Sequence, residues 1–217
     1  MKILALEFSS EMRSVALAES GRVAGRAAEC GGRSTRAFAL IDAALREAGW
    51  EREAIECIAV GLGPGSYAGI RAAIALAQGW QFARQIHVLG VGSAECLAAQ
   101  AHSEGKRGVV HFLIDAQRGE FYCARAELAE AAPHVESLRL IGLEEARLLP
   151  AETLVVERAL VKFFPNARAL CPDAAALGKL ASARGDFVSA EKLEPVYLRP
   201  VSFVKALPPR VIPSLLS

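Results

Sequence analysis

The chain has 217 residues, 53% of them hydrophobic and 23% charged, and its 25 basic and 24 acidic side chains leave a formal net charge of +1. This composition is typical of a globular protein with an ample core. The length allows one large domain or two small ones around a cleft. A protein that grips nucleic acid by itself usually carries a basic excess or a basic stripe, so the near-neutral balance argues against autonomous RNA binding.

Cysteine spacing and hydropathy exclude further classes. The five cysteines are widely spaced and include no C-x-x-C pair, so neither a zinc knuckle nor a dithiol redox motif is indicated. They are expected to be small buried residues in a reducing compartment. The first apolar run ends at Glu7, too early for a signal peptide. No stretch of about 18 apolar residues could span a membrane, and we therefore expect a cytoplasmic protein.

The first half is predicted to have the order β-β-β-α-β-α-β-α. A tight hairpin is expected at Ser20-Gly21, since such pairs favour short turns. Apolar runs and alternation predict strands at residues 3–8, 14–19, 22–27, 58–60 and 86–91. Apolar residues three or four apart predict helices over residues 34–48, 67–83 and 93–102.

A polar break at residues 103–108 predicts a domain boundary, with one α/β subdomain over 1–104 and a second over 105–217 that ends in a proline-rich tail. In the second half we expect strands at 109–115, 120–126, 137–140, 153–156 and 169–170, and helices over 143–148, 158–163 and 174–184. Both halves open with a strand that ends in an acid and is followed by a second strand. This similarity is compatible with a duplicated mixed-sheet domain.

The segment "AVGLGPGSYAGIR" at 59–71 leaves two interpretations open. A strand, a glycine-rich turn and a helix capped by Ser66 would suit a bound anion, because free N–H groups lie at the helix start. The segment matches neither G-x-x-x-x-G-K-[ST] nor G-x-G-x-x-G. Gly63, Gly65 and Ser66 are therefore candidates either for a phosphate cradle or for a structural turn that aims the helix.

The helix predicted over 67–83 is apolar on nearly all sides, which indicates burial on nearly all sides. Its small alanines would allow another helix to approach closely. We predict that it forms a partner interface together with the preceding helix. The predicted interface residues are Phe38, Ile41, Leu45, Ile70, Ala73, Ile74, Leu76, Ala77 and Trp80.

Five blocks in order resemble the TsaB (YeaZ) family, the bacterial partner proteins of tRNA threonylcarbamoyladenosine modification. They are "ILALEFSSEMRSVAL" at 3–17, "AVGLGPGSYAGIRAAIALAQG" at 59–79, "HVLGVGSAECLA" at 87–98, "IDAQRGEFY" at 114–122 and "PVYLRP" at 195–200. The resemblance implies two related mixed-sheet α/β subdomains of the actin, sugar-kinase and Hsp70 type. It also implies a TsaD-type catalytic subunit as partner, bound through the N-terminal helices, a TsaE-type ATPase, and tRNA contact within the complex.

The same resemblance implies which residues correspond to the superfamily's phosphate and metal site. These nucleotide-site candidates are Glu7, Ser9 and Ser10, with Asp115 opening the second half. The family usually has Asp-Thr-Ser where this chain has Glu7-Phe8-Ser9, and His-Ser at Arg33-Ser34. The longer carboxylate beside a phenylalanine puts phosphate or metal use in doubt, so we expect no cofactor beyond weak ATP or ADP binding.

Three functions are compared for this sequence: a scaffold subunit, a phosphotransferase and a peptidase. A non-catalytic scaffold subunit is favoured, because the four histidines include no pair within one helical turn, as a metal pair on one helix face requires. We therefore expect no metal site. An independent ATP-dependent phosphotransferase is the alternative, although no second phosphate loop is evident. A serine peptidase would need a Ser-His-Asp geometry that the sequence does not supply. A self-complementary helix face would also give a homodimer without the partner.

Overall fold

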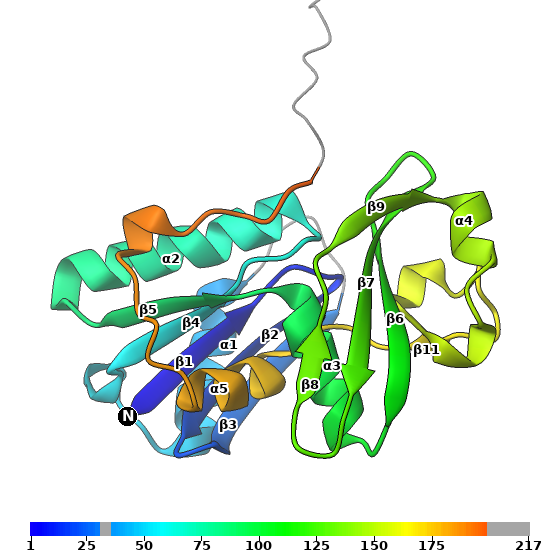
Figure 1. Cartoon of the computed structure of the whole chain (residues 1–217). Helices are drawn as coiled ribbons and strands as arrows, with labels where there is room; N and C mark the ends of the chain where they lie inside the picture. Colours follow the sequence, from blue (N-terminus) through cyan, green and yellow to red (C-terminus); the bar gives the residue numbers. More distant parts are fainter. Residues whose placement is uncertain (31–35, 199–217) are drawn as a thin grey trace, which may run out of the picture.

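The computed structural model describes residues 1–30 and 36–198, which form two mixed β-sheets side by side (Figure 1). The first two residues of the predicted helix over 34–48, and the proline-rich end of the chain, lie outside the described residues. Within the described ranges, no helix is long and apolar enough to cross a membrane. The two sheets with their helices form the α/β arrangement that the resemblance to the actin, sugar-kinase and Hsp70 fold implies.

The first sheet has the order β3-β2-β1-β4-β5. Its strands are β1 (Lys2–Glu7), β2 (Met12–Glu19), β3 (Arg22–Cys30), β4 (Cys57–Gly61) and β5 (His87–Val91). β1 pairs antiparallel with β2 and parallel with β4. Ser20 and Gly21, with φ of 51° and 76°, form the predicted hairpin between β2 and β3.

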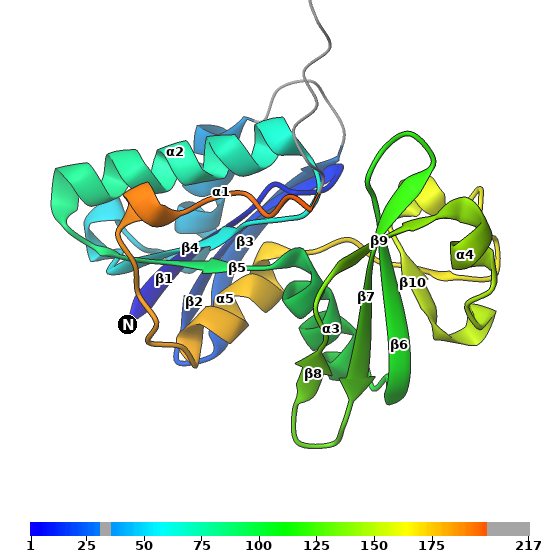
Figure 2. The same ribbon diagram turned by 45° about the horizontal axis from the view of Figure 1, so that its top comes forward.

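Helices cover both faces of this sheet (Figures 1 and 2). On one face, α1 (Ala37–Ala48) and α2 (Tyr67–Arg84) pack on the large side chains of β1 and β2. On the other face, α5 (Ala174–Ser182) packs on the small side chains that alternate with them. The sheet is thus the buried middle layer of three, which explains the near-continuous apolar sequence of β1.

The second sheet has the order β11-β10-β6-β7-β8, with β9 paired to β7. Its strands are β6 (Gly108–Asp115), β7 (Glu120–Leu128), β8 (Pro133–Val135), β9 (Arg139–Gly142), β10 (Leu154–Val156) and β11 (Arg168–Ala169). α3 (Ser93–Ser103) packs on one face, and α4 (Leu143–Arg147) with the 3₁₀ turn η3 (Arg158–Leu160) packs on the other. β6 pairs antiparallel with β7 and parallel with β10, which repeats the pairing of β1.

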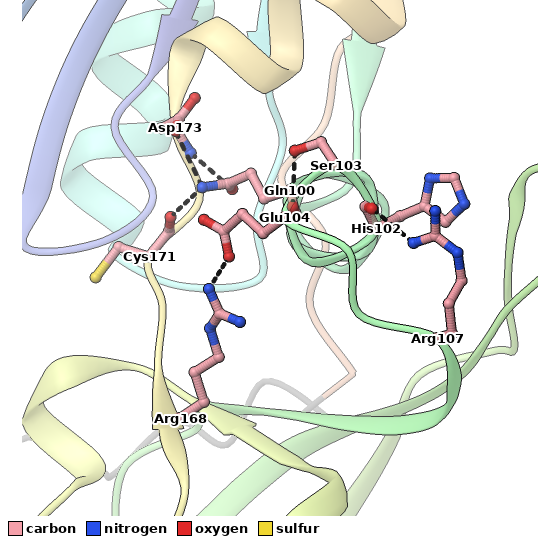
Figure 3. A network of polar contacts seen from close by, with 8 residues as sticks. All are labelled: Gln100, His102, Ser103, Glu104, Arg107, Arg168, Cys171 and Asp173. Atoms are coloured by element: carbon pink, nitrogen blue, oxygen red, sulfur yellow. Dashed lines mark hydrogen bonds and ion pairs between the residues drawn. The ribbon is translucent and has the colours of Figure 1, made fainter.

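The chain crosses back to the first sheet after β11, through a segment fixed by α3 (Figure 3). The Gln100 side-chain amide donates to the Cys171 carbonyl oxygen and to Asp173 Oδ2, both at 3.0 Å. Gln100 Oε1 accepts the Asp173 backbone N–H at 3.2 Å. Asp173 Oδ1 in turn caps α5 by accepting from the Ala176 N–H. One buried amide therefore fixes the crossing and the start of α5.

Some predictions in the second half need correction. The predicted boundary assigns residues 174–193 to the second subdomain, but α5 and Leu193 pack on the first sheet. The helix predicted over 158–163 is the short turn η3. The strand predicted at 137–140 corresponds to β9, and β8, η1 (Arg52–Ala54), η2 (Ala151–Thr153) and η4 (Ala190–Lys192) were not predicted. These are short elements whose periodicity is too brief to recognise.

Candidate functional site

A cleft of about 610 Å³ lies beyond the carboxyl ends of β1, β4, β6 and β10, where the two sheets face each other. Open α/β sheets usually bind ligands at such edges. Among the residues that line the cleft are five of the predicted site residues: Ser9, Ser10, Gly65, Ser66 and Asp115. Glu7 and Gly63 lie behind its surface, in the protein interior. The structure therefore brings most of the sequence candidates together.

Glu7, the last residue of β1, is completely buried. Its Oε1 accepts the Ser9 backbone N–H at 2.7 Å, and its Oε2 has no hydrogen-bond partner in the described chain. Burial raises the pKa of the Glu7 carboxyl, against the opposing effect of the Ser9 hydrogen bond and of Arg13. A Cβ at Gly61 would lie 2.0 Å from Glu7 Oε2. Glycine at 61 therefore makes room for the longer acid.

The serines of the first site bond within the protein. Ser9 Oγ lies 3.0 Å from Ser93 Oγ, at the start of α3. Ser10 Oγ donates to the Met12 carbonyl oxygen at 3.1 Å and accepts the Met12 N–H at 3.2 Å. These hydroxyls thus fix the turn between β1 and β2.

The glycine turn is tied to the same β1–β2 turn. The Ser66 backbone N–H donates to the Ser9 carbonyl oxygen at 2.5 Å, and Ser66 Oγ caps α2 by accepting from the Gly69 N–H. A Cβ at Gly65, whose φ is 149°, would lie 2.1 Å from the Ser9 oxygen. Gly63 has a φ of 83°. These contacts favour the structural interpretation of the turn, since the groups that a phosphate would need are bonded to the protein.

Asp115, at the end of β6, is held by the turn that follows it. Its Oδ1 accepts the Gln117 backbone N–H at 2.7 Å, and its Oδ2 accepts from the Gln117 side-chain amide at 2.9 Å. Gln117 and Arg118 have left-handed φ angles of 64° and 60°. The Asp115 carboxylate therefore stabilises an unusual turn between β6 and β7.

Glu157, which follows β10, was missed in the sequence although it lines the cleft. Its Oε2 accepts the Asp115 backbone N–H at 3.2 Å. Burial raises the pKa of Glu157 to about 7, and repulsion from Asp115, Glu11 and Glu7 contributes in the same direction. A signal was present, because Glu157 follows a short apolar strand as Asp115 does.

Arg13 on β2 is the basic residue of the cleft lining. Its guanidinium donates to the carbonyl oxygens of Phe8 and Ser10, and to Ser66 Oγ at 2.9 Å. These bonds tie the glycine turn to the end of β1. In the described ranges, no group of three or more His, Cys, Asp or Glu side chains is arranged to hold a metal ion. The cleft thus presents carboxylates, hydroxyls and one guanidinium that is already hydrogen-bonded within the chain.

The predicted partner residues separate into two sets. Six of them are buried within the chain, so the prediction that they form a contact surface is wrong. These six are Ile41, Leu45, Ile70, Ala73, Ile74 and Ala77, each 7% exposed or less. They face the first sheet, as the apolar stripe of a covering helix does. The other three, Phe38, Leu76 and Trp80, line a groove of about 440 Å³ between α1 and α2.

The outer face of α2 also exposes apolar side chains, next to the polar Arg71, Gln78 and Arg84. Phe82 is 93% exposed and Phe38 on α1 is 62% exposed. Ala75 and Gly79 lie exposed between them and line the same groove. We call Phe38, Ala75, Leu76, Gly79, Trp80, Phe82 and Ala83 the α1–α2 face. The sequence analysis did not predict Phe82 as a contact residue. A signal was present, because Phe82 does not fall on the apolar stripe that faces the sheet.

Comparisons with known proteins agree on one family. A family model described as "TsaD: tRNA N6-adenosine threonylcarbamoyltransferase" matches residues 33–179. "tRNA threonylcarbamoyladenosine biosynthesis protein TsaB" of Escherichia coli K12 is 29% identical over 96% of this chain and 99% of its own length. The solved structure "YeaZ from Pseudomonas aeruginosa" superposes with a TM-score of 0.77 at 33% identity, over 91% of this chain and 99% of that one. The chain therefore belongs to the TsaB (YeaZ) family, within the wider family that the TsaD model describes.

Proposed function

We propose that the chain is a non-catalytic partner subunit for a TsaD-type catalytic subunit. In this role it supports formation of N6-threonylcarbamoyladenosine at position 37 of tRNAs that read codons beginning with A. The names of its relatives, which place them in threonylcarbamoyladenosine biosynthesis, support this assignment. A cytoplasmic location is part of this proposal, and a role on tRNA is consistent with it.

The observation that carries the proposal is the α1–α2 face. Monomeric proteins rarely expose large contiguous apolar surfaces, and such surfaces usually mark interaction sites. Here the nearly fully exposed Phe82 shares α2 with the apolar residues of the groove, whose lining also includes Arg52, Glu53 and Arg84. Exposed aromatic anchors next to a groove are typical hot spots of protein interfaces. The equivalent helices of a related subunit would cover this face in a four-helix contact.

The cleft supports a non-catalytic role. The turn that a phosphate would use is bonded to Ser9 and Arg13. Asp115, which would face a metal–nucleotide complex, is held by both donors of Gln117. An independent phosphotransferase is therefore disfavoured, and we expect no nucleotide of the chain's own in the cleft. A TsaE-type ATPase would join the complex, tRNA would bind to the assembled subunits, and the α1–α2 face would form a homodimer when the partner is absent.

Truncating the exposed anchor tests the proposal. Phe82→Ala should weaken binding of the catalytic subunit by about 2 kcal/mol, roughly 30-fold, because a central aromatic anchor is removed. Leu148→Ala is the matched control, since Leu148 is 84% exposed on the second half. Affinity would be measured by titration calorimetry. Modified tRNA would be measured by mass spectrometry after reaction with the catalytic subunit and threonylcarbamoyl-adenylate.

Three results would contradict the proposal. The first is modified tRNA made by this chain without the catalytic subunit. The second is unchanged affinity in Phe82→Ala and Phe38→Ala with the fold intact by circular dichroism. Equal losses in the Leu148→Ala control would also argue against a contact at the α1–α2 face.

A further inference from the structure

The cleft between the sheets carries a surplus of negative charge. Glu11, Asp115 and Glu157 line it, against the single guanidinium of Arg13. No ion pair in the described part of the chain involves any of these three carboxylates. Arg13 is held by two carbonyl oxygens and Ser66, so its bonds are directed at the turn. These acids therefore form no ion pair among the described residues, and Arg13, whose bonds go to the turn, is the one lining cation that attracts Glu157 electrostatically.

A buried carboxyl directly behind the cleft points the same way. Glu7 is fully buried, and its Oε2 has no hydrogen-bond partner among the described residues. Its Oε1 is bonded to the backbone of Ser9, which lines the cleft. Glu7 and Glu157 are close enough to repel each other electrostatically. A buried carboxyl oxygen without a hydrogen-bond partner is costly, and a positive group in the cleft would stabilise the ionised form of Glu7.

Aromatic rings form another part of the wall. Tyr67, Tyr122 and Tyr197 line the cleft, and the rings of Tyr67 and Tyr197 lie 5.3 Å apart. The Arg71 guanidinium already lies 5.2 Å from the Tyr67 ring centroid. Faces of tyrosine rings attract ammonium and guanidinium groups, more strongly where water is excluded. Carboxylates and tyrosines together are the surroundings that an organic cation prefers.

We propose that this cleft binds an organic cation, an alkylammonium or guanidinium group held between the Glu157–Asp115 carboxylates and the tyrosine rings. The volume of about 610 Å³ suits a small molecule or one long side chain. A free polyamine and a lysine or arginine side chain of a partner protein present the same chemistry. A nucleoside triphosphate does not fit, because its phosphates would meet three carboxylates. Among the lining residues the one cation, Arg13, is already bonded to the turn.

Titration calorimetry of the full chain at about 0.15 M salt tests this site. The probes are putrescine, spermidine and N-acetyl-lysine methylamide, with 1,4-butanediol as the uncharged analogue of putrescine. We expect saturable binding of the amines with one site per chain, and none of the diol. Tighter spermidine binding would identify a free polyamine as the source, and tighter binding of the lysine amide would identify a protein side chain.

Variants and pH locate the site. Glu157→Gln should weaken amine binding about tenfold or more, since a charge-assisted contact is lost. Glu130→Gln, an exposed acid in the turn after β7, should leave it unchanged. Because Glu157 must ionise to pair with the cation, affinity should rise about tenfold from pH 6 to pH 8, and Glu157→Gln should lose most of this rise.

Four results would overturn the proposal. They are no saturable amine binding at millimolar concentration, equal binding of the diol, an equal loss in Glu130→Gln, and MgATP binding that displaces the amines. Thermal melting of each variant confirms that the fold persists. If Glu157→Gln unfolds, Tyr122→Leu provides the second test, with the same tenfold loss expected.

Discussion

The cleft and the α1–α2 face differ in how their side chains are used. In the cleft, the serines, Asp115 and Arg13 bond to the chain's own turns. On the α1–α2 face, Phe82 projects from the helix and is 93% exposed. Groups bonded within the chain hold structure, whereas an exposed apolar anchor is available to another molecule. The turns that form this end of the cleft are therefore fixed by bonds within the chain, whereas α1 and α2 present exposed apolar side chains.

The α2 helix itself allows the sharpest test of this difference. Ala73 is completely buried against the sheet, and Ala75, two residues later, is exposed. Ala73→Glu should lower the free energy of unfolding by about 4 kcal/mol or more, because it buries an unpaired charge. Ala75→Glu should change it by less than about 0.5 kcal/mol but weaken partner binding at least about tenfold. Urea denaturation and calorimetry measure the two effects.

If Ala73→Glu folds but fails to bind the partner, the partner contacts the inner face of α2. An Ala75→Glu that binds with full affinity would remove the outer face from the interface. The matched control is Ala131→Glu, at an exposed position in the loop after β7, which should change neither stability nor binding.

The sequence predicted the first half better than the second. The long apolar periods gave α2 and α3 nearly to the residue, and the Ser20-Gly21 pair gave the hairpin. The return of α5 to the first sheet could not be predicted, because an amphipathic helix fits either sheet equally well. What decides its place is Gln100, which fixes the crossing segment through contacts more than 70 residues away along the chain.

The candidate site was predicted in part. The family resemblance implied Glu7 and Asp115, which both stand at the ends of strands. Glu157 stands just after a strand in the same way, and looking for such acids would have added it to the cleft. The partner residues were misassigned because an all-round apolar helix does not show which side meets the sheet. The exposure of Phe82 follows from the direction in which α2 packs, which is a tertiary property. The hydrogen bonds from Gln117 to Asp115 could not be predicted either, because they depend on a turn with two left-handed residues.

The glycine turn gives the next largest expected effect. Gly65→Val should destabilise the chain by about 3 kcal/mol, since it places a β-branched residue at positive φ and against the Ser9 carbonyl oxygen. Gly185→Ala is the control, because a Cβ there meets nothing within 4 Å. Thermal melting measures both. A variant at 65 that keeps its stability but loses a measured nucleotide affinity would restore the phosphate-cradle interpretation.

The smallest effect expected is the pH dependence of the cleft. The folded-state pKa of Glu157 is raised to about 7 from an ordinary value of 4.5, so the folded chain binds the proton more tightly than the unfolded chain. The contribution of Glu157 to stability is therefore most favourable below about pH 4.5 and is lost as the pH rises toward 7. Glu157→Gln cannot ionise, so this loss is absent from the variant. Between pH 4.5 and pH 8 its free energy of unfolding should therefore rise, relative to that of the unmodified protein, by up to about 3 kcal/mol. Urea denaturation at both pH values measures this difference. Glu130→Gln should show no such change, because Glu130 is exposed. If Glu157→Gln follows the same pH profile as the unmodified chain, Glu157 is ionised in the fold across this range, and the cleft already neutralises its charge from within.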